Sequence, residues 1–241
     1  MEFISTYDQH YHGDKKDLFK KCYDSFLHNC ENDQEASHDG TIWKNVCSKK
    51  VQNIHITIDK SHVDGHKNLC RFRVNCIFET TPEKAMALTF DGNRRLEWDT
   101  TLESIDVLKT FKKGFEMIRF VGKKYPMVKQ REFINYQWKL FDETTKTYLC
   151  VWTGVDEEVC QIESTETNDY TKTPTNRIRG LNHCGSGWRF SPGRKEGTTE
   201  FQGCLTVDLK GKLLKKMVNK MTPSVLEGLC IELAKKIQAK T

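Results

Sequence analysis

The chain has 241 residues, of which 37% are hydrophobic and 29% are charged. This composition is typical of a globular protein with a substantial core, and it excludes a disordered chain. The formal net charge of +5 is small for a dedicated nucleic-acid binder, but it would favour docking on an anionic membrane surface.

The N-terminal segment and the cysteines indicate a cytoplasmic protein. Residues 1–17 contain no apolar region of the kind found in signal peptides. No apolar run approaches the roughly 18 residues that span a bilayer. The ten cysteines form no CxxC pair, so we expect reduced thiols rather than disulfides or a metal site.

The first third of the chain alternates between helical and strand patterns. Residues 14–30 predict an amphipathic helix, because apolar side chains recur every four residues. These side chains are Leu18, Cys22, Phe26 and Cys30. Residues 51–59 and 69–80 alternate between apolar and polar, which predicts two strands joined by a turn.

A short helix is predicted next, since Thr81 and Pro82 provide an N-cap and a first helical residue. After it comes RRLEWD, residues 94–99, two arginines and an aspartate beside a tryptophan. A buried guanidinium requires a carboxylate or phosphate partner. The run is therefore either a structural ion pair or the polar end of a ligand cavity.

Residues 101–208 contain a series of alternating segments at hairpin spacing, which predicts one large antiparallel sheet. Residues 213–237 then predict a long helix with a single apolar stripe that lies on the concave face of this sheet. We expect Thr222-Pro223 to kink or restart the helix. The stripe consists of Met217, Met221, Val225, Leu229, Leu233 and Ile237.

The order of these motifs resembles the START family, the steroidogenic acute regulatory protein-related lipid transfer domains. The resemblance covers residues 14–239 and implies a single domain, 1–241. It implies an α+β helix-grip fold, in which a curved antiparallel sheet wraps a long C-terminal helix around an internal lipid tunnel. The matching segments are IWKNV (42–46), RRLEWDTTLESIDVL (94–108), REF (131–133), NRIRG (176–180), SGWRF (186–190) and VDLKGKLLKKMVNK (207–220).

The resemblance also implies site residues. Arg95 and Asp99 match a buried pair that receives the headgroup phosphate in phospholipid-binding members, and His183 is a further headgroup candidate. A salt bridge at the sheet edge is the alternative for Arg95 and Asp99, and plain core packing is the alternative for each lining residue. The tunnel-lining candidates are Phe120, Tyr136, Trp152, Met221, Val225 and Leu229.

The strands around the tunnel bear on the lipid class. Sterol-binding members carry an acid and an arginine near positions 117–119 and 137, where this chain has Met117, Ile118, Arg119 and Gln137. We therefore expect that acid–base pair to be absent and a phospholipid to be the cargo. The aromatic cage of choline-binding members is incomplete. A sterol or ceramide carrier remains the alternative, followed by a cyclase-like enzyme on the same fold.

Residues 122–131 match the family's loop over the tunnel mouth. Lys123, Lys124 and Lys129 supply positive charge, and Tyr125 suits a headgroup boundary. With the kink at Pro223, the segment predicts a gate that opens on an anionic membrane. A solvated charged loop is the alternative.

Other chemistry finds little support in the sequence. Acids such as Glu97 and Glu103 lie near the expected tunnel, but no nucleophile is paired with a base, so we expect no catalysis and no cofactor other than a bound lipid. The histidine pairs His10/His12 and His62/His66 lack the companion ligands of a metal site. Basic residues are dispersed, which argues against nucleic acid. We expect a monomeric shuttle, with a lipid-sensing adaptor as the alternative.

Overall fold

The computed structural model describes residues 4–5, 15–31, 42–51, 53–63, 69–155, 173–211 and 215–239. Most of the elements expected from the sequence fall within these ranges. The helices are α1 (Lys16–Glu31), α2 (Pro82–Phe90), α3 (Gly92–Leu96) and α5 (Lys215–Gln238). The strands are β1 (Ile4–Ser5), β2 (Lys44–Val51), β3 (Ile54–His62), β4 (Cys70–Phe78), β5 (Leu102–Lys112), β6 (Phe115–Gly122), β7 (Gln130–Asp142), β8 (Thr147–Gly154), β9 (Arg177–Arg179), β10 (Leu181–Asn182), β11 (Ser186–Pro192) and β12 (Thr199–Asp208).

The turn expected between the two strands, at residues 64–68, lies outside the described residues. The same holds for His66, His10 and His12, and for the side chain of Met217.

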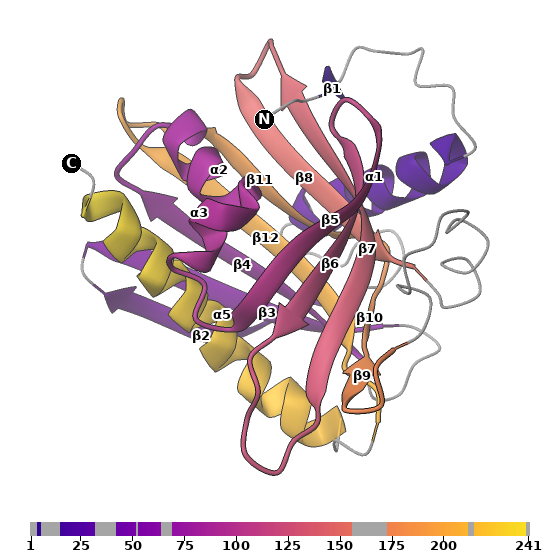
Figure 1. The fold of residues 1–241 in the computed structure, drawn as a ribbon. Helices are drawn as coiled ribbons and strands as arrows, with labels where there is room; N and C mark the ends of the chain where they lie inside the picture. Colours follow the sequence, from indigo (N-terminus) through magenta and orange to yellow (C-terminus); the bar gives the residue numbers. More distant parts are fainter. Residues whose placement is uncertain are drawn as a thin grey trace.

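The sheet is open and almost entirely antiparallel. Its strands follow the order β2-β3-β4-β12-β11-β8-β7-β6-β5, with β1 and β9 added in parallel to β7 and β10 paired with β12 (Figure 1). Both edge strands are irregular. A bulge interrupts β2 between Asn45 and Cys47, and β5 shifts register at three points along its pairing with β6. The predicted antiparallel sheet is confirmed.

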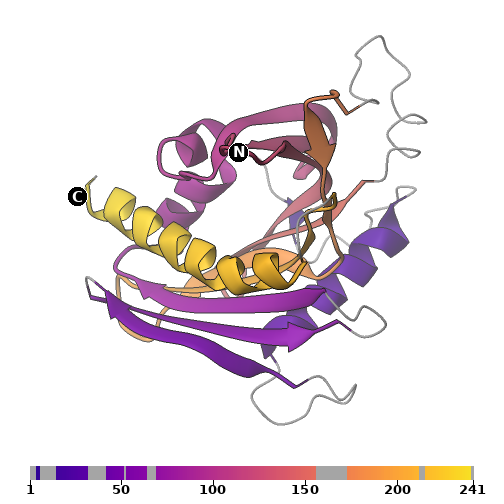
Figure 2. The same cartoon turned by 90° about the horizontal axis from the view of Figure 1, so that it is seen from below.

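Helices cover both faces of the sheet. On the inner face, α5 packs against β2, β3, β4 and α2, and Figure 2 shows it lying across this half of the sheet with α2 and α3 beside it. On the outer face, α1 packs against β8, β11 and β12. Each face has its own buried apolar cluster. The α+β helix-grip architecture is therefore confirmed.

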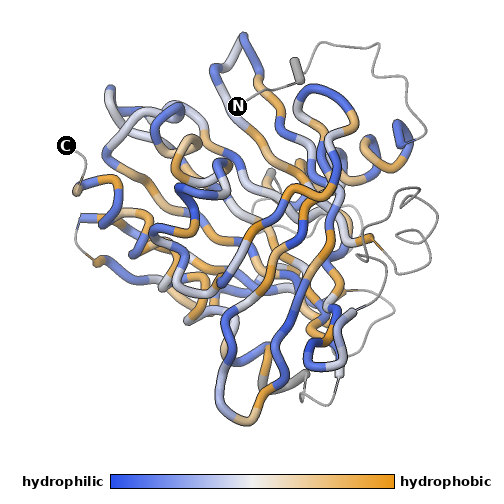
Figure 3. Tube along the Cα trace, in the orientation of Figure 1, coloured by the Kyte–Doolittle hydropathy of each residue, from blue (hydrophilic) through white to orange (hydrophobic). Residues whose placement is uncertain are grey.

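Strand β7 shows how side chains are divided between the two faces. Ile134, Tyr136 and Trp138 belong to the outer cluster with α1. Because successive side chains of a strand point to opposite faces, Asn135, Gln137 and Lys139 point inward. Figure 3 shows the corresponding alternation of polar and apolar residues along the strands.

Helix α1 confirms the prediction for residues 14–30, since Cys22 and Phe26 are fully buried in the outer cluster. The ring of Phe26 lies directly over Gly187 of β11. A Cβ at position 187 would come within 2.7 Å of Phe26 Cδ2, so the close approach of α1 to the sheet requires glycine there.

Helix α5 is continuous through Pro223, so the predicted restart at this residue does not occur. The single apolar stripe is also wrong. Four residues advance about 400° around a helix, so a spacing of four drifts by about 40° at each step. Leu233 and Ile237 are buried, whereas Met221 and Val225 remain 55% and 42% exposed. The residues buried on the sheet side are Thr222, Leu226, Cys230, Leu233, Ala234 and Ile237.

Helix α2 begins at Pro82 as predicted, but the short helix α3 was not expected. Asp91 caps α3, because its Oδ1 accepts the backbone N–H groups of Asn93 and Arg94 at 3.0 and 3.1 Å. Strand β2 was also missed as a strand, because its side chains are mostly exposed and its sequence does not alternate. Helix α3 matters most here, because it positions Arg95.

Candidate functional site

Arg95 and Asp99 form an ion pair at the end of α3. Arg95 Nε donates to Asp99 Oδ2 at 3.0 Å, and the Asp99 side chain is fully buried. Asp99 Oδ1 accepts two further bonds from Thr101, from the backbone N–H at 3.0 Å and from the hydroxyl at 2.6 Å. The carboxylate is therefore held in place from both sides, and it fixes the direction of the arginine.

Aromatic rings from two distant strands flank the Arg95 guanidinium. Its carbon lies 4.5 Å from the ring centroid of Trp188 on β11 and 5.4 Å from that of Phe120 on β6. Trp152 on β8 packs edge-on against Trp188, with ring centroids 5.9 Å apart. Two of the predicted lining residues, Phe120 and Trp152, thus lie close to Arg95, and Trp188 joins them.

Arg95 keeps hydrogen-bonding capacity for a ligand. Among the described residues, its ion pair uses only Nε, and neither Nη1 nor Nη2 donates to a protein oxygen. Two terminal N–H groups on one guanidinium match two oxygens of a phosphate. The side chain is only 17% exposed, so such a bond would form in a partly dehydrated setting.

A second ion pair lies on the same inner face. Lys139 Nζ on β7 donates to Glu116 Oε2 on β6 at 2.7 Å, and the Lys139 side chain is 8% exposed. Lys139 pairs in register with Cys150 of β8, which belongs to the inner cluster. Burial raises the pKa of the Cys150 thiol to about 12, while Lys139 and Arg95 act in the opposite direction. Both cations therefore lie near the same buried thiol.

The pair corrects one expectation from the sequence. We expected no acid–arginine pair around positions 117–119 and 137, and Glu116 and Lys139 instead form a carboxylate–ammonium pair beside these positions. The absence of a charged pair is therefore no longer an argument against a sterol.

The exposed apolar residues of α5 point toward α3. Lys236 on α5 pairs with Glu97 at the end of α3, at 2.7 Å. Leu229 and Val225 precede Lys236 by seven and eleven residues, so both lie within about 20° of it around the helix. The stripe of Met221, Val225 and Leu229 therefore faces the side on which Arg95 lies, rather than the sheet beneath α5.

Two predicted residues lie elsewhere. Tyr136 belongs to the outer cluster, where it packs against Phe115 and Trp138, so it does not line the inner face. His183 lies at the corner between β10 and β11, where its backbone N–H donates to the backbone carbonyl of Thr206 at 2.9 Å. The contacts of Arg95 and Asp99 do not include His183.

The predicted gate is an exposed loop between β6 and β7. Lys123, Lys124 and Tyr125 are exposed, and Met127 at the tip is fully exposed with a positive φ of 59°. Lys129 Nζ donates to Thr175 O at 3.3 Å, which ties the loop to the segment before β9. The loop thus combines lysines with exposed apolar side chains.

Comparison with known proteins decides the family. The START domain model matches residues 26–226. The chain belongs to the START domain family. No curated relative matches the sequence.

Solved structures of START proteins share the fold at low sequence identity. The human StAR-related lipid transfer protein 5 superposes with a TM-score of 0.76 at 16% identity, covering 92% of this chain and 96% of its own. Human STARD10 superposes with a TM-score of 0.69 at 15% identity, covering 90% of this chain and 80% of its own. The lipid transfer and protein localization domain of human StarD13 superposes with a TM-score of 0.66 at 14% identity, covering 93% of this chain and 97% of its own.

The motifs that carry the START resemblance have structural roles in this chain. Arg131 of REF is buried and donates to Leu209 O and Lys210 O, both at 3.2 Å, so it anchors the segment before α5. Burial also lowers the pKa of Arg131. This arginine is therefore a structural anchor rather than part of the basic docking loop.

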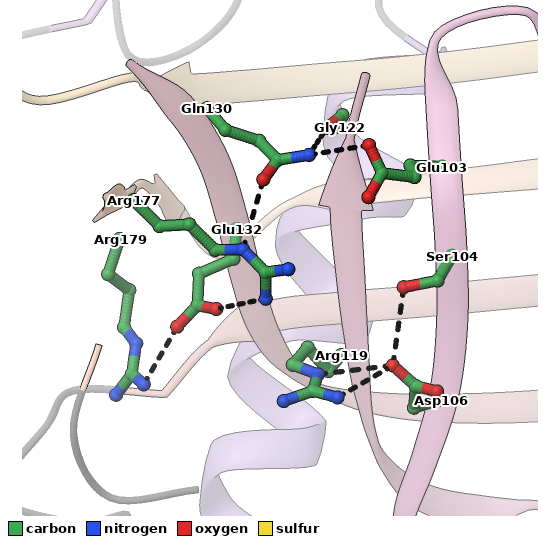
Figure 4. A network of polar contacts seen from close by, with 9 residues as sticks. All are labelled: Glu103, Ser104, Asp106, Arg119, Gly122, Gln130, Glu132, Arg177 and Arg179. Atoms are coloured by element: carbon green, nitrogen blue, oxygen red, sulfur yellow. Dashed lines mark hydrogen bonds and ion pairs between the residues drawn. The ribbon is translucent and has the colours of Figure 1, made fainter. Parts of the chain in front are cut away.

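Glu132 of the same motif joins β7 to β9. It is buried, and its two oxygens pair with Arg179 at 3.1 Å and Arg177 at 3.5 Å (Figure 4). On the neighbouring strands Arg119 pairs with Asp106 at 2.9 Å (Figure 4). By strand alternation these ion pairs lie on the outer face, where they link β7 to β9 and β6 to β5.

The described residues contain neither a metal-binding cluster nor a membrane-spanning helix. Within those ranges no group of three or more His, Cys, Asp or Glu side chains has the arrangement of a metal site. None of the helices there combines the length and hydropathy that crossing a bilayer requires.

Sequence reasoning missed Trp188, Glu116 and Lys139. The available signal was the polar side of EFINYQWKLFD, which reads as a solvent-facing set in an alternating strand. In the structure nearly all of β7 is buried on both faces. Polar side chains that alternate with apolar ones can therefore line an internal surface rather than face solvent, and this possibility was not considered for β7.

Proposed function

We propose that this START domain carries one phospholipid, with the headgroup phosphate on Arg95 and the acyl chains along the inner face beside α5. The observation that carries the proposal is Arg95 itself. It is fixed by Asp99 and flanked by Trp188 and Phe120, and its two Nη groups are free of protein hydrogen bonds within the described residues.

The apolar surfaces support the same assignment. Two acyl chains of about 30 carbons in total would cost on the order of 20 kcal/mol if left in water, at ~0.8 kcal/mol per methylene. Met221 and Val225 hold exposed apolar surface on the face of α5 that points toward α3. Burial of this surface by a lipid would supply part of that free energy.

The domain would act as a monomeric cytoplasmic shuttle that touches membranes only briefly. The loop of Lys123, Lys124, Tyr125 and Lys129 would dock on an anionic surface, and movement near Pro223 would open the path for the lipid. The solved neighbours support a carrier, since two of them are named as lipid transfer proteins or domains.

A sterol or ceramide is the second candidate, because of the Glu116–Lys139 pair. A carboxylate and an ammonium side by side offer an acceptor and a donor to a headgroup hydroxyl. This candidate predicts that binding depends on Lys139 and Glu116 rather than on Arg95.

Native mass spectrometry of the protein incubated with mixed liposomes tests the proposal. We expect a mass increase of one phospholipid per chain. An increase of one sterol or ceramide would favour the second candidate, and no lipid mass from any mixture would overturn the carrier function. Product analysis after long incubation would reveal turnover if the domain were an enzyme.

A further inference from the structure

Two cysteines that lie far apart in the sequence meet beneath α1. Cys22 Sγ on α1 donates to Cys184 Sγ at 3.1 Å, and Cys184 lies at the corner between β10 and β11. Cys22 is fully buried, whereas Cys184 is partly exposed. One thiol is therefore within reach of a small reagent, and the second lies directly behind it.

The packing of the corner holds the two sulfur atoms together. Gly185 has a positive φ of 82° and lies against α1, where its carbonyl accepts Asn29 Nδ2 at 3.2 Å. A Cβ at this position would come within 2.6 Å of Asn29 Nδ2 and 3.1 Å of Ser25 Cβ. The corner is thus seated closely on the helix that carries Cys22.

The surroundings favour a thiolate on Cys184. The hydrogen bond from Cys22 lowers the pKa of Cys184, and Thr153 and Lys21 act in the same direction against the effect of burial. The same hydrogen bond and burial raise the pKa of Cys22. The Thr153 hydroxyl lies 3.5 Å from Cys184 Sγ. Cys184 is therefore the nucleophile of the pair, and Cys22 remains a thiol.

We propose that Cys22 and Cys184 form a peroxide-sensitive dithiol, which closes to an intramolecular disulfide between α1 and the β10–β11 corner. The Cys184 thiolate attacks one oxygen of hydrogen peroxide, the O–O bond breaks, and hydroxide leaves to give a sulfenic acid. Cys22 sulfur then attacks Cys184 sulfur. The S–O bond breaks, and the hydroxyl leaves with the Cys22 proton as water.

A second thiol pair provides an internal comparison. Cys76 on β4 and Cys230 on α5 are both buried in the inner cluster, and Cys230 acts with burial to raise the pKa of Cys76. Burial raises the pKa of Cys76, so it lacks the thiolate that peroxide attacks. We expect this pair to stay reduced while Cys184 reacts.

Peptide mapping after treatment with hydrogen peroxide tests the proposal. The intact mass should fall by two hydrogen atoms, and dithiothreitol should restore it. Chymotrypsin cleaves after Tyr23, which separates Cys22 from Cys30. The map should then show the Cys22 peptide joined to the Cys184 peptide.

Three variants sharpen the test. Cys184→Ser should abolish the disulfide, and Cys22→Ser should leave a sulfenic acid on Cys184 that dimedone traps. Cys47→Ser is the matched control, because Cys47 is partly exposed but its sulfur contacts Glu227 rather than a thiol. This control should form the disulfide as the parent chain does.

A peroxide-treated parent chain with no Cys22–Cys184 peptide would overturn the proposal, as would a disulfide formed mainly by other cysteines. This result depends on no variant, so it decides the question even if Cys22→Ser fails to fold. Lipid binding is measured separately, and its failure would leave the dithiol intact.

Discussion

Two cations share the inner face, the partly buried Arg95 and the buried Lys139, and each is paired with a carboxylate. Arg95 pairs with Asp99 within one turn of chain, and Lys139 pairs with Glu116 across neighbouring strands. Buried charges require such partners, because an unpaired ion in the interior costs several kcal/mol. Each of these two cations thus has a neighbouring counter-charge, so a ligand can add hydrogen bonds without first neutralising a bare charge.

Removing the Arg95 guanidinium tests its proposed role. Arg95→Ala should weaken phospholipid uptake by at least about 10-fold, since two charge-assisted hydrogen bonds at about 1.5 kcal/mol or more each are lost. Sterol uptake should fall less. Uptake from liposomes into the purified variant gives the comparison.

Asp99→Asn is the matched control for Arg95→Ala. It removes the negative charge but keeps the arginine and an amide oxygen that can still accept the Arg95 Nε–H bond, so it should retain most phospholipid uptake while losing comparable stability. Equal losses of uptake in the two variants, each with a lowered melting temperature, would show that the pair is purely structural.

Glu132 should matter for stability alone. Glu132→Ala removes a buried carboxylate and leaves Arg179, whose side chain is 8% exposed, without this partner. We expect the free energy of unfolding to fall by about 3 kcal/mol. The control Asp106→Ala breaks a more exposed pair and should cost less than about 1 kcal/mol. Denaturant unfolding of both variants measures the difference, and equal losses would refute it.

At the scale of elements, α5 divides its surface between two roles. Leu226, Cys230 and Ile237 pack on the sheet, while Met221 and Val225 keep exposed apolar surface toward α3. The exposed apolar surface of Met221 and Val225 contributes nothing to packing on the sheet, so it points to a role other than stability. This division predicts that the two sets of residues respond differently to substitution.

Val225→Asp should impair lipid uptake strongly while changing the free energy of unfolding by less than about 1 kcal/mol, because the residue is 42% exposed. Leu226→Ala should instead cost about 2–5 kcal/mol of stability. Ser224→Asp adds the same charge at an exposed position of α5 and should leave uptake unchanged. Loss of uptake in Ser224→Asp equal to that in Val225→Asp would contradict the assignment.

The elements show how far the sequence alone could lead. The pairing of Arg95 with Asp99 was predictable because the residues lie four apart in the chain. The pair Glu116–Lys139 depends on the register between two strands, which the sequence does not specify. Tyr136 was assigned to the wrong face because alternation separates two faces without showing which one the last helix covers. The stripe on α5 was wrong because a spacing of four drifts around the helix.

For the whole molecule, the charge of one loop should govern docking. Replacing Lys123, Lys124 and Lys129 with glutamate should slow lipid transfer to anionic vesicles by more than about 10-fold at low salt, since each lysine near such a surface contributes about 1 kcal/mol. Transfer to neutral vesicles should change little, and high salt should reduce the difference. A vesicle transfer assay measures both rates.

The β5–β6 turn supplies a matched control for this charge reversal. Lys109, Lys112 and Lys113 are exposed at the opposite end of β6 from the docking loop. Their replacement with glutamate changes the net charge equally and should leave transfer to anionic vesicles nearly as fast as in the parent chain. Equal slowing by both triple variants would indicate a general charge effect rather than docking by one loop.

The irregular borders of the open sheet have a consequence for solubility. A border strand presents unpaired N–H and C=O groups on which a strand of another molecule could polymerise. Strand β2 is bulged and carries exposed Lys44 and Lys50, and β5 is bulged and carries exposed Lys109 and Lys112. Repulsion between lysines of neighbouring molecules and the bulged geometry of both edge strands disfavour intermolecular strand pairing. The open sheet should therefore resist aggregation through its edges.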